Sequence, residues 1–174
     1  MRLFIALPVT EGVRKTLEQT QAALRGQGVR GRFTPPENWH VTLVFLGSVP
    51  EAEPVIAALK SVKLPRESLR LDRLTLFGDV LTALCQPNGA LAAYVKALRA
   101  ALEAAGLPYD RQAFRPHITL CRKTAFPSAD FRLFPFERGL RNAILPVKEA
   151  RLLSSDLSGD RPRYTALYTE NAKR

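Results

Sequence analysis

The chain has 174 residues, of which 46% are hydrophobic and 24% are charged, and it carries a net charge of +10. This length can bury a sizeable core, whereas the apolar runs are too short for a transmembrane helix or a secretory signal, and two cysteines do not make a disulfide scaffold. We therefore expect a monomeric cytoplasmic protein without membrane association. Its arginine-rich charge fits a polyanionic partner and a merely solvated basic surface equally well.

The first part of the chain predicts a strand, a helix and a second strand. Residues 2–8 form a short apolar run, and apolar residues recur at helical spacing from 10 to 25. Glycines and prolines between residues 26 and 36 indicate a loop, after which residues 38–47 are predicted as a strand. A second helix is expected over residues 48–60.

A hairpin and a third helix follow. Residues 69–77 and 80–86 are predicted as two strands joined by a tight turn. Asn88 is expected to cap a helix that ends before Gly106, because asparagine and glycine are preferred at these two positions. The remaining strands are expected at 115–122, 147–153 and 164–169, with only weak periodicity in 125–146.

The two histidines of the chain each open the same phrase, His40-Val41-Thr42-Leu43 and His117-Ile118-Thr119-Leu120. Both phrases have the composition of a strand, and residues i and i+2 of a strand point to one face. Each copy is therefore predicted to present an imidazole beside a hydroxyl. Because histidine titrates near neutral pH, two of them can serve as one acid and one base.

The order of the predicted elements repeats around these phrases. A strand, a helix and a histidine strand occur in residues 2–47 and again in residues 80–122. This order indicates two related halves that place their histidine strands equivalently. If the halves pack about a pseudo-two-fold axis, the two strands converge on one cleft.

Two histidines and two threonines around one cleft suit phosphoryl transfer. A preorganised set of donors can hold a phosphate anion and stabilise its transition state without a metal, while the imidazoles exchange protons at opposite ends. A zinc site built from His40, His117, Cys85 and Cys121 is an alternative, because strand parity puts Cys121 on the face of His117. It lacks the close ligand spacing typical of such sites.

The sequence resembles the two-histidine (2H) phosphoesterase superfamily, and within it the RNA 2',3'-cyclic phosphodiesterases, historically called 2'-5' RNA ligases. The similarity runs nearly end to end and includes the opening strand, both motifs with their flanks, and the closing strands. The matching segments are Arg2 to Ala6, Glu37 to Gly47, Phe114 to Arg122, and Leu152 to Leu157 followed by Tyr164.

This resemblance implies an α+β fold: one bilobal domain over residues 1–174, with two pseudo-two-fold-related lobes of antiparallel sheet, outer helices and a cleft between the lobes. Each lobe would carry one His-x-Thr-Leu strand. The implied activity is hydrolysis of RNA 2',3'-cyclic phosphate ends to 2'-phosphates, with no metal and no cofactor, and with reversible 2'-5' RNA ligation as a further activity. The expected partner is RNA ending in a 2',3'-cyclic phosphate, tRNA fragments among them.

The resemblance also implies roles for individual residues. His40 would donate a proton to the departing 3' oxygen, and His117 would accept one from water. Thr42, Thr119 and Arg122 would bind phosphate oxygens, although strand parity puts Arg122 on the face opposite His117, so that only a bulge, bend or strand end could bring it to the site. Two aromatic side chains could stack on a base or pack in the core, namely Phe4 and Trp39.

Two alternative functions follow from the same features. An RNA-binding module with little turnover would use the basic charge alone, and its binding would be sensitive to salt but not to loss of the histidines. A phosphodiesterase for a small cyclic nucleotide would use the same residues on a different substrate.

Overall fold

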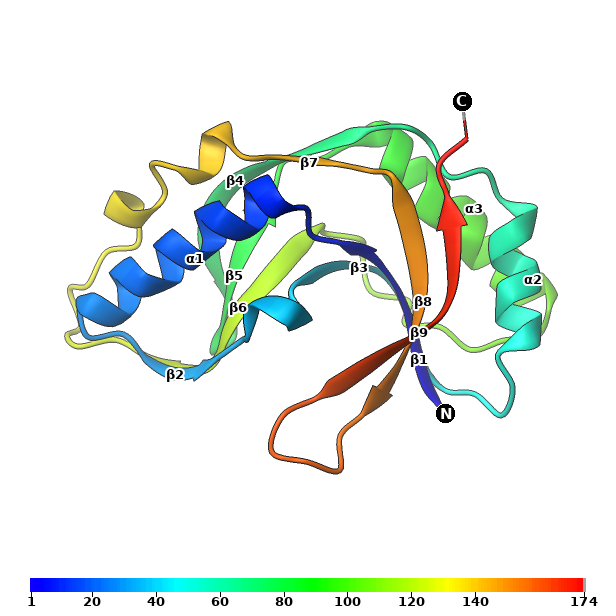
Figure 1. The fold of residues 1–174 in the computed structure, drawn as a ribbon, viewed down its shortest axis with the longest axis horizontal. Coiled ribbons are helices and arrows are strands. Elements are labelled where there is room, and N and C mark those ends of the chain that lie inside the picture. The colour runs from blue at the N-terminus through cyan, green and yellow to red at the C-terminus, as the bar shows by residue number, and fades with distance from the viewer. Residues whose placement is uncertain (174) are drawn as a thin grey trace.

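The computed structural model describes residues 1–173, which form an α+β fold around an antiparallel sheet (Figure 1). No helix in this range is long and apolar enough to cross a membrane. The α-helices are α1 (Glu11–Gly26), α2 (Glu53–Ser61) and α3 (Gly89–Ala104). The strands are β1 (Arg2–Pro8), β2 (Arg30–Phe33), β3 (His40–Ser48), β4 (Ser68–Phe77), β5 (Val80–Cys85), β6 (His117–Ala125), β7 (Ile144–Pro146), β8 (Glu149–Asp156) and β9 (Arg163–Asn171). Short 3-10 turns are η1 (Pro36–Asn38), η2 (Phe134–Phe136) and η3 (Leu140–Asn142).

The strand order puts the two histidine strands side by side in the middle of the sheet. The order is β7-β4-β5-β6-β3-β1-β8-β9, with β2 paired to β6 outside this path. On either side of the central β3 and β6 pair lie β1 and β5, and each of these precedes the helix that leads to its histidine strand. The predicted α+β fold with two related halves is therefore confirmed.

The two long helices, α1 and α3, each lie over the half of the sheet that does not contain the strand before them. In Figure 1, α1 lies over the side of β4, β5 and β6, although it follows β1 in the chain, and α2 and α3 lie on the side of β8 and β9. Contacts of α1 with β7 and of α3 with β3 agree with this view. The amide of Gln21 on α1 donates to the Leu120 carbonyl of β6 at 3.0 Å. Each half therefore completes the core of the other, and one cluster of buried side chains spans both.

Most of the predicted elements are present. The hairpin turns between Phe77 and Val80, which are paired, and the Asn88 side chain caps α3 by accepting from the Leu91 amide at 2.9 Å. Two predictions need correction. The segment expected to be a loop contains β2, and α2 begins at Glu53, five residues later than expected. Propensity did not indicate β2, because its four residues, two of them exposed arginines, owe their conformation to pairing with β6.

Candidate active site

The two histidines lie on neighbouring strands at the boundary between the halves. Val41 of β3 pairs with Ile118 of β6, and both of these side chains are fully buried. Because the strands are antiparallel, this register puts Thr42 opposite His117 and Thr119 opposite His40. The four side chains predicted for the site thus alternate across the strand pair, with each histidine beside the threonine of the other motif.

His40 lies in an enclosed environment. Its Nδ1 is 2.8 Å from the Asn38 carbonyl oxygen, which can only accept, so Nδ1 carries the proton and donates. Its Nε2 is 3.0 Å from the Thr42 hydroxyl, and its ring packs 5.0 Å from Phe4 and 5.4 Å from Tyr164 between ring centroids. Burial lowers the pKa of His40 to about 4; the Asn38 carbonyl opposes this shift, and nearby positive charge adds to it.

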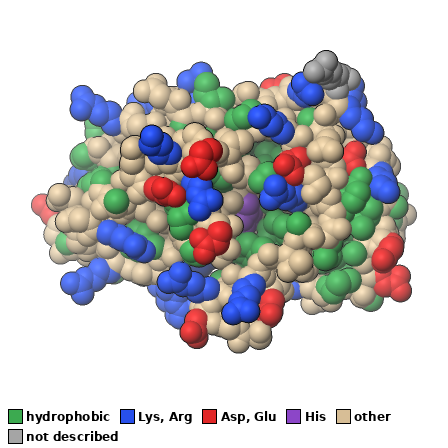
Figure 2. All heavy atoms as spheres, viewed as in Figure 1, with side chains coloured by type: hydrophobic (Ala, Val, Ile, Leu, Met, Phe, Trp, Pro, Cys, Tyr) green, Lys and Arg blue, Asp and Glu red, His purple; other side chains and the backbone are tan. Residues whose placement is uncertain are grey.

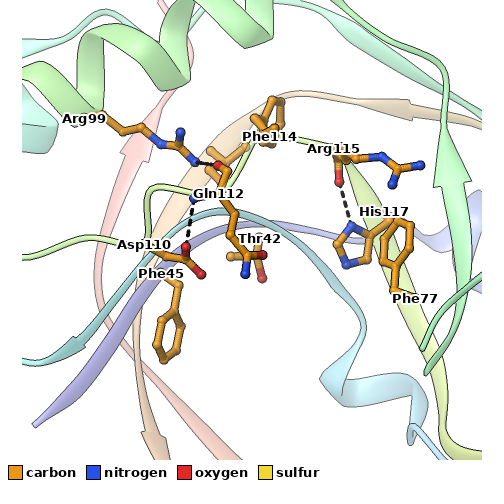
Figure 3. A pocket seen from close by; sticks show the side chains of 11 residues that line it. Thr42, Phe45, Phe77, Arg99, Asp110, Gln112, Phe114, Arg115 and His117 are labelled. Atoms are coloured by element: carbon orange, nitrogen blue, oxygen red, sulfur yellow. Dashed lines mark hydrogen bonds between the residues drawn. The ribbon is translucent and has the colours of Figure 1, made fainter. Parts of the chain in front are cut away.

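His117 is held in the same way but is more open. Its Nδ1 donates to the Arg115 carbonyl oxygen at 2.6 Å, which fixes the tautomer and leaves Nε2 for the site (Figure 3). The ring of Phe77 stands perpendicular to the imidazole at 4.8 Å, and the Arg115 guanidinium lies 4.6 Å from the centre of the Phe77 ring. Burial lowers the pKa of His117, the Arg115 carbonyl raises it, and the charges of Arg115 and Arg122 lower it further.

Each motif contains a β-bulge at its leucine. On β3, Thr42 pairs with Ala6 and Val44 with Ile5, so that Leu43 is the extra residue. On β6, Thr119 pairs with Thr82 and Cys121 with Leu81, so that Leu120 is the extra residue. A bulge shifts the alternation of side chains by one position. The residue five positions after each histidine therefore returns to the face of the histidine.

The bulge in β6 corrects two predictions made from strand parity. Arg122 shares the face of His117, and its charge lowers the pKa of both His40 and His117, which agrees with a position at the site. Cys121 instead points to the opposite face and is completely buried. The proposed zinc set therefore does not form, and residues 1–173 contain no other cluster of three His, Cys, Asp or Glu side chains suited to a metal ion.

The same shift in β3 brings Phe45 to the site face, a residue that the sequence analysis did not single out. Phe45 stands five positions after His40, as Arg122 stands five positions after His117. The repeat itself contains this signal, because Phe45 and Arg122 each stand two residues after the leucine of their phrase. Its exposure agrees with this position, since Phe45 is half-buried between the buried Val44 and Leu46.

A pocket of about 270 Å³ opens beside His117 (Figure 3). Thr42 and His117 line one part of it, and Asp110 and Gln112, in the segment between α3 and β6, line another. Its lining includes three aromatic side chains on separate segments, namely Phe45, Phe77 and Phe114. The pocket is therefore continuous with the histidine site and is lined by both aromatic and polar side chains.

Phe4 and Trp39, named as base-stacking or core residues, are each 4% exposed. Phe4 packs against His40 and Tyr164, and Trp39 belongs to the hydrophobic core. Neither offers a free ring face to a base, and packing accounts for both. Phe4 still contributes to the site, because its ring helps to enclose His40.

The surrounding surface is rich in basic side chains. In Figure 2 one histidine is visible at the bottom of a hollow near the middle of the face, and Lys and Arg side chains project around this hollow, with several carboxylates among them. The net charge of +10 favours the approach of a negatively charged ligand to the molecule.

Comparison with known proteins gives one consistent result. The family model described as LigT like Phosphoesterase matches the chain twice, over residues 7–85 and 83–164, one match for each half. The chain is 34% identical to the RNA 2',3'-cyclic phosphodiesterase of Thermus thermophilus over 183 aligned positions, which cover 96% of this chain and 88% of the relative. Similar names belong to relatives from Bacillus subtilis and Aquifex aeolicus, at 26% and 25% identity.

Solved structures agree with this result. E. coli LigT complexed with 3'-AMP superposes with a TM-score of 0.78 at 25% identity, covering 99% of this chain and 98% of that one. The structure of TT0787 from Thermus thermophilus has a TM-score of 0.76 at 31% identity, covering 98% and 97%. The similarity extends over the whole described fold, including both histidine strands.

Proposed function

The chain belongs to the LigT-like phosphoesterase family, and from this premise we propose that it hydrolyses RNA 2',3'-cyclic phosphate ends to 2'-phosphates. The observation that carries the proposal is the pair of histidines on adjacent strands, each with Nδ1 hydrogen-bonded to a backbone carbonyl. Nε2 is therefore the ring nitrogen that exchanges a proton, and Nε2 of His40 lies beside the Thr42 hydroxyl. The names of the relatives support a hydrolase that acts on a cyclic phosphodiester. RNA is the proposed substrate on the same ground.

In the proposed reaction, a water oxygen attacks phosphorus, and the bond between phosphorus and the 3' oxygen breaks. His117 accepts a proton from the water through Nε2, and His40 donates a proton to the departing 3' oxygen. Thr42 and Thr119 donate hydrogen bonds to phosphate oxygens, and the Arg122 guanidinium offsets their charge. The phosphate stays on the 2' oxygen.

The pKa values support a division of roles that the bound phosphate completes. In the free protein, burial and positive charge keep both histidines largely neutral near pH 7. A neutral His117 is ready to act as a base. A phosphate anion beside His40 stabilises the imidazolium and raises the pKa of His40. His40 therefore becomes protonated, as a general acid must be, when substrate is bound.

The terminal nucleoside is proposed to occupy the pocket beside His117. Phe45, Phe77 and Phe114 line it, and stacking of a base on an aromatic ring contributes roughly 1–3 kcal/mol. Ring stacking tolerates any base, which suits an enzyme that acts on RNA ends of varied sequence. If a 5' hydroxyl replaced water in the reverse reaction, the same residues would join RNA ends through a 2'-5' bond.

Product analysis of an RNA oligonucleotide ending in 2',3'-cyclic phosphate, in the presence of a chelator, tests the proposal. We expect a 2'-phosphate from the wild-type protein and almost none from His40→Ala or His117→Ala, with far-ultraviolet circular dichroism confirming that the variants fold. A 3'-phosphate product, or turnover that persists without either histidine, contradicts the proposed reaction. Tight binding without turnover would identify an RNA-binding module instead.

A further inference from the structure

A second arginine lies next to Arg122 on the strand that the sequence did not predict. Arg32 of β2 pairs with Arg122 of β6, and Phe33 pairs with Cys121. Directly opposed residues in an antiparallel pair point to the same face. Phe33 and Cys121 share the buried face, so Arg32 shares the face of Arg122, which is the face of the histidines.

A glycine allows β2 to come this close. Gly31 has a φ of +148°, and a Cβ atom there would lie 2.6 Å from the Cys121 sulfur and 2.7 Å from the Arg122 carbonyl oxygen. Such distances leave no room for any side chain. The bulged segment of β6 is therefore held directly against the backbone of β2, which fixes Arg32 beside Arg122.

This arrangement places two positive charges, those of Arg32 and Arg122, side by side without an ion pair to a carboxylate among residues 1–173. Like charges directly opposite each other on neighbouring strands destabilise a sheet. None of the ion pairs formed within residues 1–173 involves Arg30, Arg32, Arg122 or Lys123, all of which lie on this edge. A bound polyanion would offset this repulsion, because arginine pairs with phosphate through two parallel hydrogen bonds.

We infer that Arg32 binds a second phosphate, the phosphodiester that precedes the terminal nucleotide of the RNA. The inference rests on the proposed function, in which Arg122 contacts the cyclic phosphate. Opposed residues have Cα atoms about 5 Å apart, so two long arginine side chains can serve two separate groups. The site then distinguishes an RNA end, which has this phosphodiester, from a cyclic mononucleotide, which lacks it.

The test compares Arg32→Gln with wild type on two substrates, an RNA oligonucleotide ending in 2',3'-cyclic phosphate and a 2',3'-cyclic mononucleotide without a 5' phosphate. We expect kcat/KM to fall about tenfold on the oligonucleotide and less than twofold on the mononucleotide, as loss of one charged hydrogen-bonded contact implies. The control is Arg66→Gln, which makes the same charge change in the segment between α2 and β4 and should alter neither value. Equal losses on both substrates, or no loss on the oligonucleotide, overturn the inference.

A binding measurement separates this inference from the proposed function. The affinity for an RNA oligonucleotide ending in 2'-phosphate, followed by fluorescence anisotropy against salt concentration, requires no turnover. Arg32→Gln should reduce the slope of log K against log salt by about 0.7, the value for one contact with a single-stranded phosphate. An unchanged slope overturns the role of Arg32 even if the enzyme is active, and a reduced slope supports it even if the protein hydrolyses neither substrate.

Discussion

The two ends of the site have the same motif and different surroundings. His40 is enclosed by the rings of Phe4 and Tyr164, and its Nε2 contacts the Thr42 hydroxyl. The ring of Phe77 packs against His117, which lines an open pocket. The duplication supplies equivalent backbone positions, and the residues packed against each strand make those positions chemically unequal.

This inequality fits the proposed roles. A base that activates water must be reached by a water molecule, and His117 is the less enclosed of the two histidines. An acid that protonates a departing oxygen benefits from an environment without competing water, where a neighbouring phosphate anion has the strongest effect on its pKa. The bulges add a second difference, because the equivalent positions after them hold Phe45 at one end and Arg122 at the other.

The largest expected effect is the loss of either histidine. His40→Ala and His117→Ala should each lower kcat on the RNA cyclic phosphate by roughly a hundred- to ten-thousandfold, the usual contribution of a general acid or base. Single-turnover rates with the chelator present measure this effect. A variant of either histidine that keeps more than a tenth of wild-type activity would remove that residue from the mechanism.

A change of leaving group separates the two roles. With sulfur in place of the departing 3' oxygen, the thiolate leaves without protonation, so the His40→Ala variant should recover much of the lost rate, whereas His117→Ala should recover little. The opposite pattern would exchange the acid and the base. Equal recovery by both variants would show that neither histidine is dedicated to the leaving group.

Burial of His40 should also make the fold sensitive to acid. Its pKa is about 4 in the folded protein and near 6.5 in an unfolded chain, so the unfolded state takes up a proton first as the pH falls. The free energy of unfolding should therefore decrease between pH 6.5 and 4, by up to about 3 kcal/mol from this residue. Urea unfolding of wild type and His40→Gln across this pH range measures the contribution of His40 to the free energy of unfolding. If that free energy falls equally with pH in both proteins, His40 makes no such contribution.

Arg122 provides the next test, because its position depends on the bulge at Leu120. Arg122→Gln should reduce kcat/KM by roughly ten- to hundredfold, as expected for the loss of a charged hydrogen-bonding partner of the phosphate. It should also raise the pKa of both histidines, since the arginine charge lowers both. Titration of the imidazole proton resonances checks the second effect, and unchanged pKa values would place the guanidinium away from the site.

Arg122 also marks the limit of what the sequence predicted. Hydrophobic periodicity and the repeated phrase were sufficient for the histidine strands and the capped helix at Asn88, because these depend on local patterns. The fold class came from the resemblance to a known family. Strand parity failed for Arg122 and Cys121, since a bulge depends on the pairing of three strands and leaves no local signal in one of them. β2 was missed for the same reason.

The smallest expected effect concerns Phe45, the counterpart of Arg122 in the first motif. Phe45→Leu keeps an apolar side chain on the site face but removes the ring that lines the pocket. If the terminal base stacks there, KM should rise about tenfold with kcat little changed, because stacking contributes roughly 1–3 kcal/mol and acts before the chemical step. Leu76→Ala, an exposed apolar residue of β4, serves as the control and should leave KM unchanged. A fall in kcat alone would mean that Phe45 shapes the bulged strand rather than holding the base.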